Sequence, residues 1–454
     1  MAQKICYLKN KSVNILSIAF FSLLLTACGD DDKPNLNNAE IHEPNSSESS
    51  GLNIAINDYD RDSVVTWNDS TEWSFKKGSA TGKLYVFEDG SWRKASDKES
   101  SAIELISPTP ANYAKGRAMN ARLGRGINLG NSWDSDSEDD AGWSNPIRDT
   151  DFATIKAAGF NSVRIPVRWQ KNSDYTTHTV DPSRLKGVME DIQLAIDQDL
   201  AVVVNFQHYD ELMCAGGAGS TGATKCQYDS LSYLAEKSHF LALWGQIAKA
   251  LDVFPDNMLV LEILNEPLLV QAERVNQLMN EAYSVIRNAA PGKTIMFESY
   301  HASKFEDLTI LRLPVNENEG NVIYSGHYYE PYTYTHQGMG YDCVGDKAKR
   351  TTAAKDFKSY VGLAKLLYPD VNGVDHIPMN LGEFGVSAGE LGRCNNGTSP
   401  SDEGRIEWTK ATAQAAIDNG MSFHYWAFGL TGGYDAYDVR KEKWVSGFPQ
   451  ALTE

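Results

Sequence analysis

LEILNEP, which runs from Leu261 to Pro267, is an apolar stretch that ends in an amide, a carboxylate and a proline. Proline cannot donate a hydrogen bond to a sheet and it restricts the residue before it, so a strand has to stop there. We therefore predict a buried strand over residues 258–266. This strand would hold Asn265 and Glu266 at its carboxyl end.

Segments of the same β-rich character recur along the chain, and amphipathic stretches separate most of them. The predicted strands span residues 125–130, 162–169, 201–208, 258–266, 294–299, 321–329, 378–384 and 421–429. Helices are predicted over 182–199, 233–252 and 272–290, because apolar residues recur three and four positions apart. Strands that are apolar on both faces and separated by helices form a parallel sheet. Eight such units favour an α/β fold of the (β/α)8 TIM-barrel type.

A doubly wound sheet is the alternative α/β architecture. Its dinucleotide-binding form needs glycines spaced as G-x-G-x-x-G after the first strand. The glycines here are Gly124, Gly126 and Gly130, which do not have that spacing. The barrel is therefore the preferred prediction.

The carboxyl ends of the predicted strands carry the candidate functional side chains, because the active site of a TIM barrel lies at that end. Carboxylates can transfer protons, aromatic rings can stack on sugar faces, and fixed cations are few. The set therefore indicates a site for a neutral, polyhydroxylated ligand. Glu298 is left open between a structural role and a substrate contact. The candidates are Trp133, Arg164, Gln207, His208, Asn265, Glu266, Glu298, His327, Tyr329, Glu383 and Trp426.

Four motifs, LEILNEP (261–267), LGEFGV (381–386), SVRIPVRW (162–169) and GHYYEP (326–331), occur in this chain. Together they resemble glycoside hydrolase family 5, the cellulase family, over about residues 120–430. The resemblance implies a retaining glycosidase with Glu266 as the acid/base and Glu383 as the nucleophile. In such enzymes the two carboxyl groups lie only about 5–5.5 Å apart.

The resemblance also implies roles for residues next to the two glutamates. Arg164 would hold Glu383 ionised by charge and hydrogen bonding, and Tyr329 would donate to the same carboxylate. His327 would lie beside Glu266 and help to set its protonation. The acid and the nucleophile would thus start in different protonation states.

Further residues would contact the substrate by the same resemblance. Asn265 would bond the sugar 2-hydroxyl, and Trp426 would form the floor of the subsite where the bond breaks. Many members of the family carry His-His after the third strand, where this chain has Gln207 and His208. We expect His208 to take the sugar-binding role, with Gln207 as the alternative, since an amide can also bond a hydroxyl.

Composition and charge restrict the class of partner. The 454 residues carry a formal net charge of −18, which argues against a nucleic-acid partner because phosphate binding needs a basic face. No metal or cofactor signature is present, and neither group is expected. We predict a monomer that binds a β-glucan polysaccharide or oligosaccharide.

The amino terminus has the pattern of a targeting segment. A basic start is followed by ILSIAFFSLLL (15–25), an apolar run that is short for a membrane span. LTAC (25–28) resembles a bacterial lipobox, which implies cleavage after residue 27 and lipidation of Cys28. The alternative is an ordinary secretory signal cleaved near Ala27. The lipid would be the only membrane contact, and we expect a location on the outer membrane or cell surface.

Four segments are predicted along the chain. Residues 1–27 form the lipoprotein signal peptide, and residues 28–51 form a disordered linker rich in polar residues. Residues 52–114 form a small β-rich region, either a separate module or an extension packed on the barrel. EDG (88–90) within it predicts a hairpin turn. Residues 115–454 form the catalytic barrel.

The cysteines predict disulfides. Cys6 leaves with the signal and Cys28 carries lipid, which leaves an even number in an exported chain. Three connectivities are possible, and we favour a local pair, Cys214–Cys226, together with Cys343–Cys394. A zinc site is the rival reading, but no CxxC spacing occurs.

The predicted function is endo-acting hydrolysis of β-1,4-glucosidic bonds in cellulose with retention. Xyloglucan, mixed-linkage glucan and mannan are the alternative substrates, because subsite loops rather than the motifs decide among them. A surface carbohydrate-binding lipoprotein without catalysis is the alternative from another class.

Overall fold

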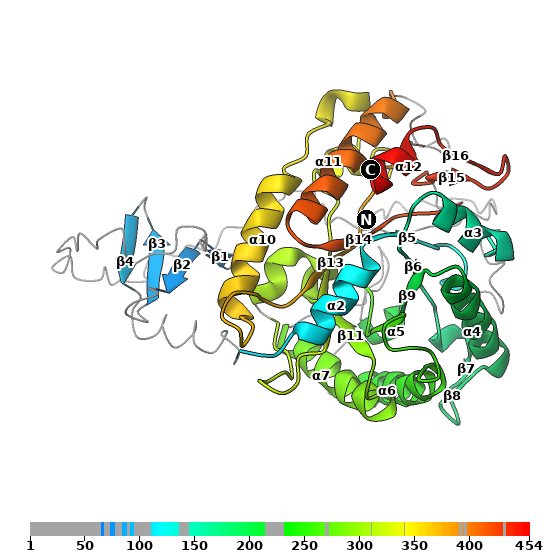
Figure 1. Ribbon diagram of the computed structural model, residues 1–454, viewed down its shortest axis with the longest axis vertical. Coiled ribbons are helices and arrows are strands. Elements are labelled where there is room, and N and C mark those ends of the chain that lie inside the picture. The colour runs from blue at the N-terminus through cyan, green and yellow to red at the C-terminus, as the bar shows by residue number, and fades with distance from the viewer. Residues whose placement is uncertain are drawn as a thin grey trace, which may run out of the picture.

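The computed structural model describes residues 110–454, except 136–144, 214–230, 268–271, 310, 340, 390–393, 395–396 and 430–432, together with four strands between residues 65 and 94. Eight strands form a closed barrel surrounded by helices (Figure 1). All neighbouring pairs in it are parallel, and the last strand pairs with the first. The predicted TIM barrel is therefore confirmed. Its strands are β5 (Arg125–Asn128), β6 (Ser162–Ile165), β9 (Ala201–Asn205), β10 (Leu259–Glu262), β11 (Thr294–Phe297), β12 (Val322–His327), β13 (Met379–Glu383) and β14 (Ser422–Tyr425).

Helices follow most of the strands, as the amphipathic stretches predict. The three predicted helices are present as α4 (Pro182–Asp197), α6 (Leu231–Leu251) and α7 (Ala272–Ala289). In α4, Pro182 occupies the first turn and the Asp181 carboxylate caps the backbone N–H of Arg184 at 2.8 Å, which explains why the helix begins there. The remaining longer helices are α2 (Ala114–Leu123), α3 (Asp149–Ala157), α10 (Ala353–Leu367) and α11 (Asp402–Asp418).

Helix α2 closes the amino-terminal end of the barrel, a feature that the sequence did not predict. Its Asn120 accepts a hydrogen bond from Ser422 at the start of β14, and the carbonyl of Leu123 accepts one from Ser162 at the start of β6. Met119 and Leu123 pack with alternate strand residues in a separate apolar cluster. The strand members of that cluster are Ala201, Val203, Val260, Met296 and Ile323. The plugged end leaves the carboxyl end of the strands for chemistry.

Shorter helices and strands lie in the connections between the barrel strands and after the last of them. They are α5 (Asp210–Met213), α8 (Tyr300–Ser303), α9 (Tyr332–Thr335), α12 (Phe448–Thr453), the 3₁₀ turns η3 (Gln170–Asn172), η5 (Phe305–Thr309) and η6 (Gly345–Ala348), and the two-stranded pairs β7 (Ser173–Asp174) with β8 (Thr179–Val180) and β15 (Tyr437–Asp438) with β16 (Lys443–Trp444). Within the described part of the chain, no helix is both long and apolar enough to span a bilayer.

The region before the barrel is β-rich, as predicted. β1 (Val65–Trp67), β2 (Trp73–Lys77), β3 (Leu84–Glu88) and β4 (Ser91–Lys94) form an antiparallel sheet in that order. β3 and β4 pair Glu88 with Ser91, which agrees with the predicted hairpin. The segment boundaries stay predictions, and residues 1–64, with the predicted signal, Cys28 and linker, lie outside the described residues.

One predicted disulfide is present. Cys343 and Cys394 are bonded with an S–S distance of 1.99 Å and a Cα–Cα distance of 5.4 Å. The bond joins the loop after β12 to the loop after β13, which are neighbours at the mouth of the barrel. Cys214 and Cys226 lie outside the described residues.

Candidate active site

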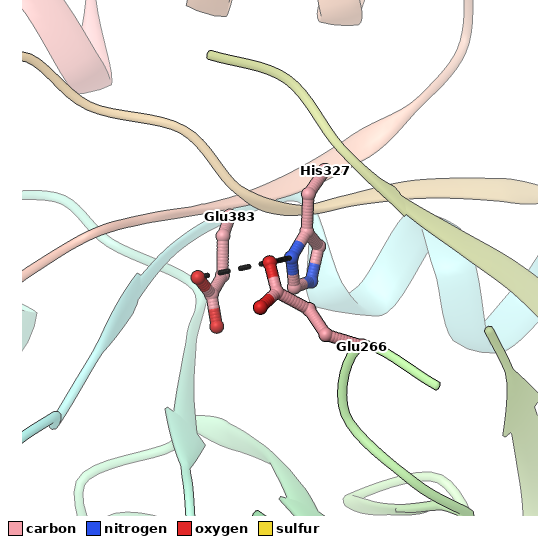
Figure 2. A group of neighbouring side chains, drawn as sticks. All are labelled: Glu266, His327 and Glu383. Carbon is pink, nitrogen blue, oxygen red and sulfur yellow. Dashed lines mark hydrogen bonds and ion pairs between the residues drawn. The ribbon is translucent and has the colours of Figure 1, made fainter. Parts of the chain in front are cut away.

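Glu266 and Glu383 come together at the carboxyl end of the barrel. Glu383 is the last residue of β13, the seventh barrel strand, and Glu266 follows β10, the fourth. One oxygen of each carboxylate and one ring nitrogen of His327 all lie within 4.8 Å of one another (Figure 2). The structure therefore brings the two predicted carboxylates close together.

The strand that leads to Glu266 ends earlier than predicted. β10 stops at Glu262, whereas residues 258–266 were predicted as strand. Beyond it, Ile263 and Asn265 each keep one backbone hydrogen bond, to the carbonyls of Met296 and Phe206. The N–H of Glu266 is bound instead by the Glu298 carboxylate at 2.5 Å. A side chain, and not the proline alone, thus ends the sheet pairing.

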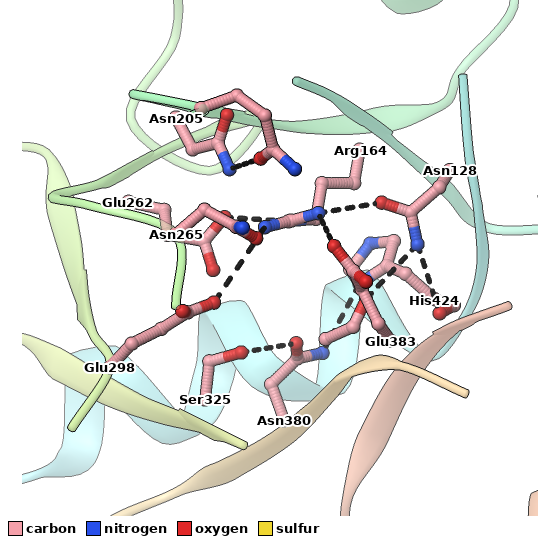
Figure 3. Close-up of polar contacts among 12 residues, drawn as sticks. Asn128, Arg164, Asn205, Glu262, Asn265, Glu298, Ser325, Asn380, Glu383 and His424 are labelled. Carbon is pink, nitrogen blue, oxygen red and sulfur yellow. Dashed lines mark hydrogen bonds and ion pairs between the residues drawn. The ribbon is translucent and has the colours of Figure 1, made fainter. Parts of the chain in front are cut away.

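Arg164 is fully buried and connects the residues of the site (Figure 3). Its Nη1 donates to Glu383 Oε1 and to Asn128 Oδ1, both at 2.9 Å. Its Nε donates to Glu262 Oε2 at 2.6 Å and its Nη2 to Asn265 Oδ1 at 2.7 Å. The planar fork of the guanidinium fixes all four partners, which an ammonium group could not do. The predicted contact between Arg164 and Glu383 is present.

The second oxygen of Glu383 is also occupied. The hydroxyl of Tyr329 donates to Oε2 at 3.1 Å, as predicted. An ionised carboxylate only accepts hydrogen bonds, so two donors on separate oxygens suit the ionised form of Glu383.

His327 links Glu266 to a third carboxylate. Its Nδ1 lies 2.8 Å from Glu266 Oε1 and its Nε2 lies 3.1 Å from Glu298 Oε1. Burial alone would lower the pKa of His327, but the carboxylates of Glu383 and Glu298 raise it well above 6.5. Burial raises the pKa of Glu266 above its ordinary value, and the hydrogen bond from His327 only partly offsets that. The geometry thus suits a proton-donating Glu266 beside a cationic His327.

The backbone around His327 is shaped for this contact. The pairing of β12 with β13 shifts register between Gly326 and His327, and such a bulge re-aims the side chain that follows it. Gly382 of β13 lies under the ring: a Cβ there would come within 2.4 Å of Ser325 Oγ and 3.1 Å of His327 Nε2. A side chain at position 382 would therefore displace His327.

Asn265 and Gln207 are more deeply buried than His208. Asn265 is buried and its Oδ1 accepts from Arg164, so its NH2 group is left to donate. Gln207 is buried and its Oε1 accepts from Asn205 Nδ2 at 2.7 Å. His208 is only partly buried, and loss of hydration together with Arg168 lowers its pKa to about 3, so its ring is neutral. A neutral, partly exposed ring fits a sugar contact better than the buried Gln207 does.

The two tryptophan candidates differ in their surroundings. Trp426 follows β14, is partly exposed, and covers Gly130, where a Cβ would come within 2.6 Å of the indole. Trp133 is buried, its Nε1 donates to Asp191 at 2.6 Å, and the Arg184 guanidinium lies 5.3 Å from its ring centre. Both of those partners belong to α4. These contacts make Trp133 a packing residue, so we leave it out of the site.

Two site residues were missed from the sequence. Asn128, the last residue of β5, accepts from Arg164 and donates to the carbonyls of Gly382 and His424. Glu262, in the middle of an apolar run, is fully buried against Arg164. Glu262 could have been found from the sequence, because it is a charged residue inside a predicted buried strand and buried charges need a partner.

A hollow lies beside His327, the residue that bonds the Glu266 carboxyl. It has a volume of about 480 Å³, and its wall includes His327, Tyr329 and Tyr332. Residues of η5, α10 and the neighbouring loops complete it: Lys304, Glu306, Asp307, Tyr328, Glu330 and Tyr360. A ligand bound beside His327 and Tyr329 has space there.

A metal could in principle use the same atoms. Among the described residues, Glu266, His327 and Glu383 are the one group of three potential ligands whose donor atoms converge. His327 already bridges Glu266 and Glu298, and Glu383 is held by Arg164, so an ion would have to break these bonds. The donor set therefore fits proton transfer better than a resident ion.

Comparison with known proteins gives the class. Residues 124–432 match the family model of cellulase, glycosyl hydrolase family 5. The chain belongs to this family.

Individual relatives agree with the family match. Endoglucanase H of Acetivibrio thermocellus is 25% identical over 319 residues, which are 70% of this chain and 31% of that protein. The xyloglucan-specific endo-beta-1,4-glucanase BoGH5A of Bacteroides ovatus is 24% identical over 239 residues, 48% of this chain and 45% of that protein. The aligned region thus covers less than half of both relatives.

A solved structure resembles the barrel over its whole length. Cel5A of Thermotoga maritima, in a complex with mannotriose, is 30% identical with a TM-score of 0.61. The alignment covers 74% of this chain and 99% of that chain. The same enzyme has also been solved with cellobiose.

Proposed function

We propose that this protein is an endo-acting glycoside hydrolase that cleaves β-1,4-glucosidic bonds in cellulose or a related β-glucan with retention. The carrying observation is the approach of the Glu266 and Glu383 carboxylates, with one oxygen of each within 4.8 Å of the other. Inverting enzymes keep their carboxyl groups about 6.5–9.5 Å apart to admit a water, whereas retaining enzymes hold them at about 5–5.5 Å. The spacing therefore supports double displacement.

In the first step, an oxygen of Glu383 attacks the anomeric carbon and forms a glycosyl ester. The bond from that carbon to the leaving sugar oxygen breaks, and this oxygen takes the proton of Glu266. Arg164 and Tyr329 hold Glu383 in place for the attack. The hollow beside His327 and Tyr332 has space for the leaving sugar.

In the second step, a water attacks the anomeric carbon and passes a proton to the Glu266 carboxylate. The ester bond to Glu383 breaks, and both glutamates return to their starting states. Asn265 has its NH2 group available for the sugar 2-hydroxyl, a contact that strengthens in the transition state. Trp426 and His208 would contact the same sugar.

The preferred polysaccharide depends on the subsites. Cellulose is our first choice, and xyloglucan, mixed-linkage glucan and mannan are the alternatives. One relative is named as specific for xyloglucan, and a similar structure holds mannotriose. Reducing-sugar release from a panel of soluble polysaccharides, measured with one purified sample, ranks them directly.

The catalytic proposal is tested against a binding-only protein with Glu383→Ala. Wild type should release reducing sugar from carboxymethylcellulose, and the variant should lose almost all of that activity. Equal, negligible release by both proteins on every polysaccharide of the panel would favour the carbohydrate-binding alternative. An active-site-directed fluoro-sugar should label Glu383, and labelling of Glu266 would reverse the two roles.

We also propose that the protein is a lipoprotein anchored through Cys28 at the outer membrane or cell surface. The support is the lipobox-like LTAC sequence after an apolar run. Cys28→Ala should move the protein from the membrane fraction to the soluble fraction. Unchanged membrane association would contradict the anchor.

A further inference from the structure

Glu298, the first residue after β11, is linked both to the backbone and to the side chain of Glu266. The side chain of Glu298 is fully buried. Its Oε2 accepts from the backbone N–H of Glu266 at 2.5 Å and from the hydroxyl of Ser303. Its Oε1 lies 3.1 Å from Nε2 of His327, whose Nδ1 bonds the Glu266 carboxyl at 2.8 Å. Glu298 thus reaches the backbone of Glu266 directly and its carboxyl through His327.

The backbone contact has a conformational reason. Glu266 has a φ of +47°, a region that residues other than glycine rarely adopt. Such a conformation persists only where the surroundings hold it. A charge-assisted hydrogen bond from its N–H to a buried carboxylate is a strong constraint of this kind.

The neighbouring carboxyl group of Glu262 carries a proton, whereas Glu298 is ionised. The carboxyl groups of Glu262 and Glu298 are both buried and each shifts the pKa of the other, an arrangement that favours a proton on one of them. Both oxygens of Glu298 already accept from donors, whereas Oε1 of Glu262 accepts from none in the described part of the chain. The proton therefore belongs to Glu262. Burial accordingly raises the pKa of Glu262 to about 8 despite Arg164.

The charges of the site then balance. With Glu262 and Glu266 protonated, two cations, Arg164 and His327, face two carboxylates, Glu298 and Glu383. Buried charges persist only when they are paired and hydrogen-bonded. Without the negative charge of Glu298, the Glu383 carboxylate, 3.7 Å from Nδ1, would be left as the ionised group that favours a cationic His327, so the ring would become neutral and bond the Glu266 carboxyl less strongly.

We propose that Glu298 is a positioning residue for Glu266: its carboxylate fixes the Glu266 backbone and keeps His327 doubly protonated, while Glu262 serves as a neutral acid that donates to Glu298. This inference rests on the acid/base role proposed for Glu266. It gives Glu298 a structural role that acts on Glu266, where the sequence had left a structural role and a substrate contact open.

The first test separates proton donation from the rest of the reaction. Cellotetraose needs a proton on its leaving oxygen, whereas 2,4-dinitrophenyl β-cellobioside has a leaving group that needs none. Glu298→Gln should lower kcat/KM on cellotetraose by roughly 10- to 100-fold, part of what general acid catalysis supplies, and change it little on the aryl substrate. Equal losses on both substrates would overturn the proposal.

A matched control tests whether the loss of any buried carboxylate, through lower stability of the fold alone, gives the same kinetic effect. Asp370 is a buried carboxylate that pairs with Arg117 and precedes β13, at the opposite end of the barrel. Asp370→Asn should lower stability without distinguishing the two substrates. If Asp370→Asn distinguishes them as Glu298→Gln does, the effect is not specific to the site and the proposal fails.

The second variant tests where the proton sits. In Glu262→Gln, the amide oxygen can accept from Arg164 and the amide NH2 can donate to Glu298, as the protonated acid does. The ring of His327 should therefore stay doubly protonated in this variant, as nitrogen-15 NMR of labelled histidine can measure. A neutral His327 ring in Glu262→Gln would show that Glu262 acts as a charged group and would overturn its assignment as a neutral acid.

A spectroscopic measurement does not depend on the substrate. Nitrogen-15 NMR of labelled histidine should show both ring nitrogens of His327 protonated at pH 7 in wild type, and a neutral ring in Glu298→Gln. A neutral ring in wild type would refute the inference. Failure of wild type to cleave any β-glucan would instead count against the proposed function and leave this NMR result to decide the role of Glu298.

Discussion

Arg164→Lys tests the central arginine without changing the charge. In wild type, Nε and Nη1 donate to carboxylates of Glu262 and Glu383, and Nη2 donates to Asn265. A lysine ammonium is a point donor that cannot reach all three partners. At least one bond to a carboxylate, worth about 1.5–3 kcal/mol, and one amide bond, worth about 0.5–1.5 kcal/mol, should be lost.

We therefore expect the free energy of unfolding to fall by about 2–4 kcal/mol. Urea unfolding followed by tryptophan fluorescence measures this change, since the chain has 10 tryptophans. Arg122→Lys is the matched control, because Arg122 pairs with an Asp199 side chain that is 72% exposed, and such surface pairs are worth about 0–1 kcal/mol. If Arg164→Lys costs no more than Arg122→Lys, the reasoning about a buried fork is refuted.

Three further predictions concern proton transfer, the disulfide and the substrate floor. Because burial raises the pKa of Glu266, kcat/KM on cellotetraose should decline at high pH only well above 4.5. The same basic limb should be absent on 2,4-dinitrophenyl β-cellobioside, whose leaving group needs no proton, and an equal limb on both substrates would point to a group other than the general acid. The disulfide spans a sequence separation of 51, so Cys343→Ser with Cys394→Ser should lower the free energy of unfolding in urea by at most about 4 kcal/mol, and reduction of wild type should match it. Trp426→Ala should lower kcat/KM on cellotetraose by about tenfold if the indole stacks on a sugar, and an unchanged value would exclude that contact.

The local contacts of the catalytic pair followed from the sequence to a large extent. Each of Glu266, Glu383 and Tyr329 comes at or just after a strand end, and parallel strands bring their carboxyl ends to one mouth. Motif order then singled out these positions among the acids of the chain. Trp133 obeyed the same positional rule, yet its indole lies against α4, because position after a strand does not set the direction of a side chain.

The sequence by itself determined the barrel and the residue types at its mouth, because apolar periodicity and strand ends are local properties. Only the tertiary structure decided how the buried groups pair: Glu262 with Arg164, and Glu298 with His327 and the backbone of Glu266. These partners come from four different strands, β6, β10, β11 and β12, and the segments just after them, so they lie far apart along the chain. Charge and proton placement depend on distances across the barrel, which no spacing along the chain encodes.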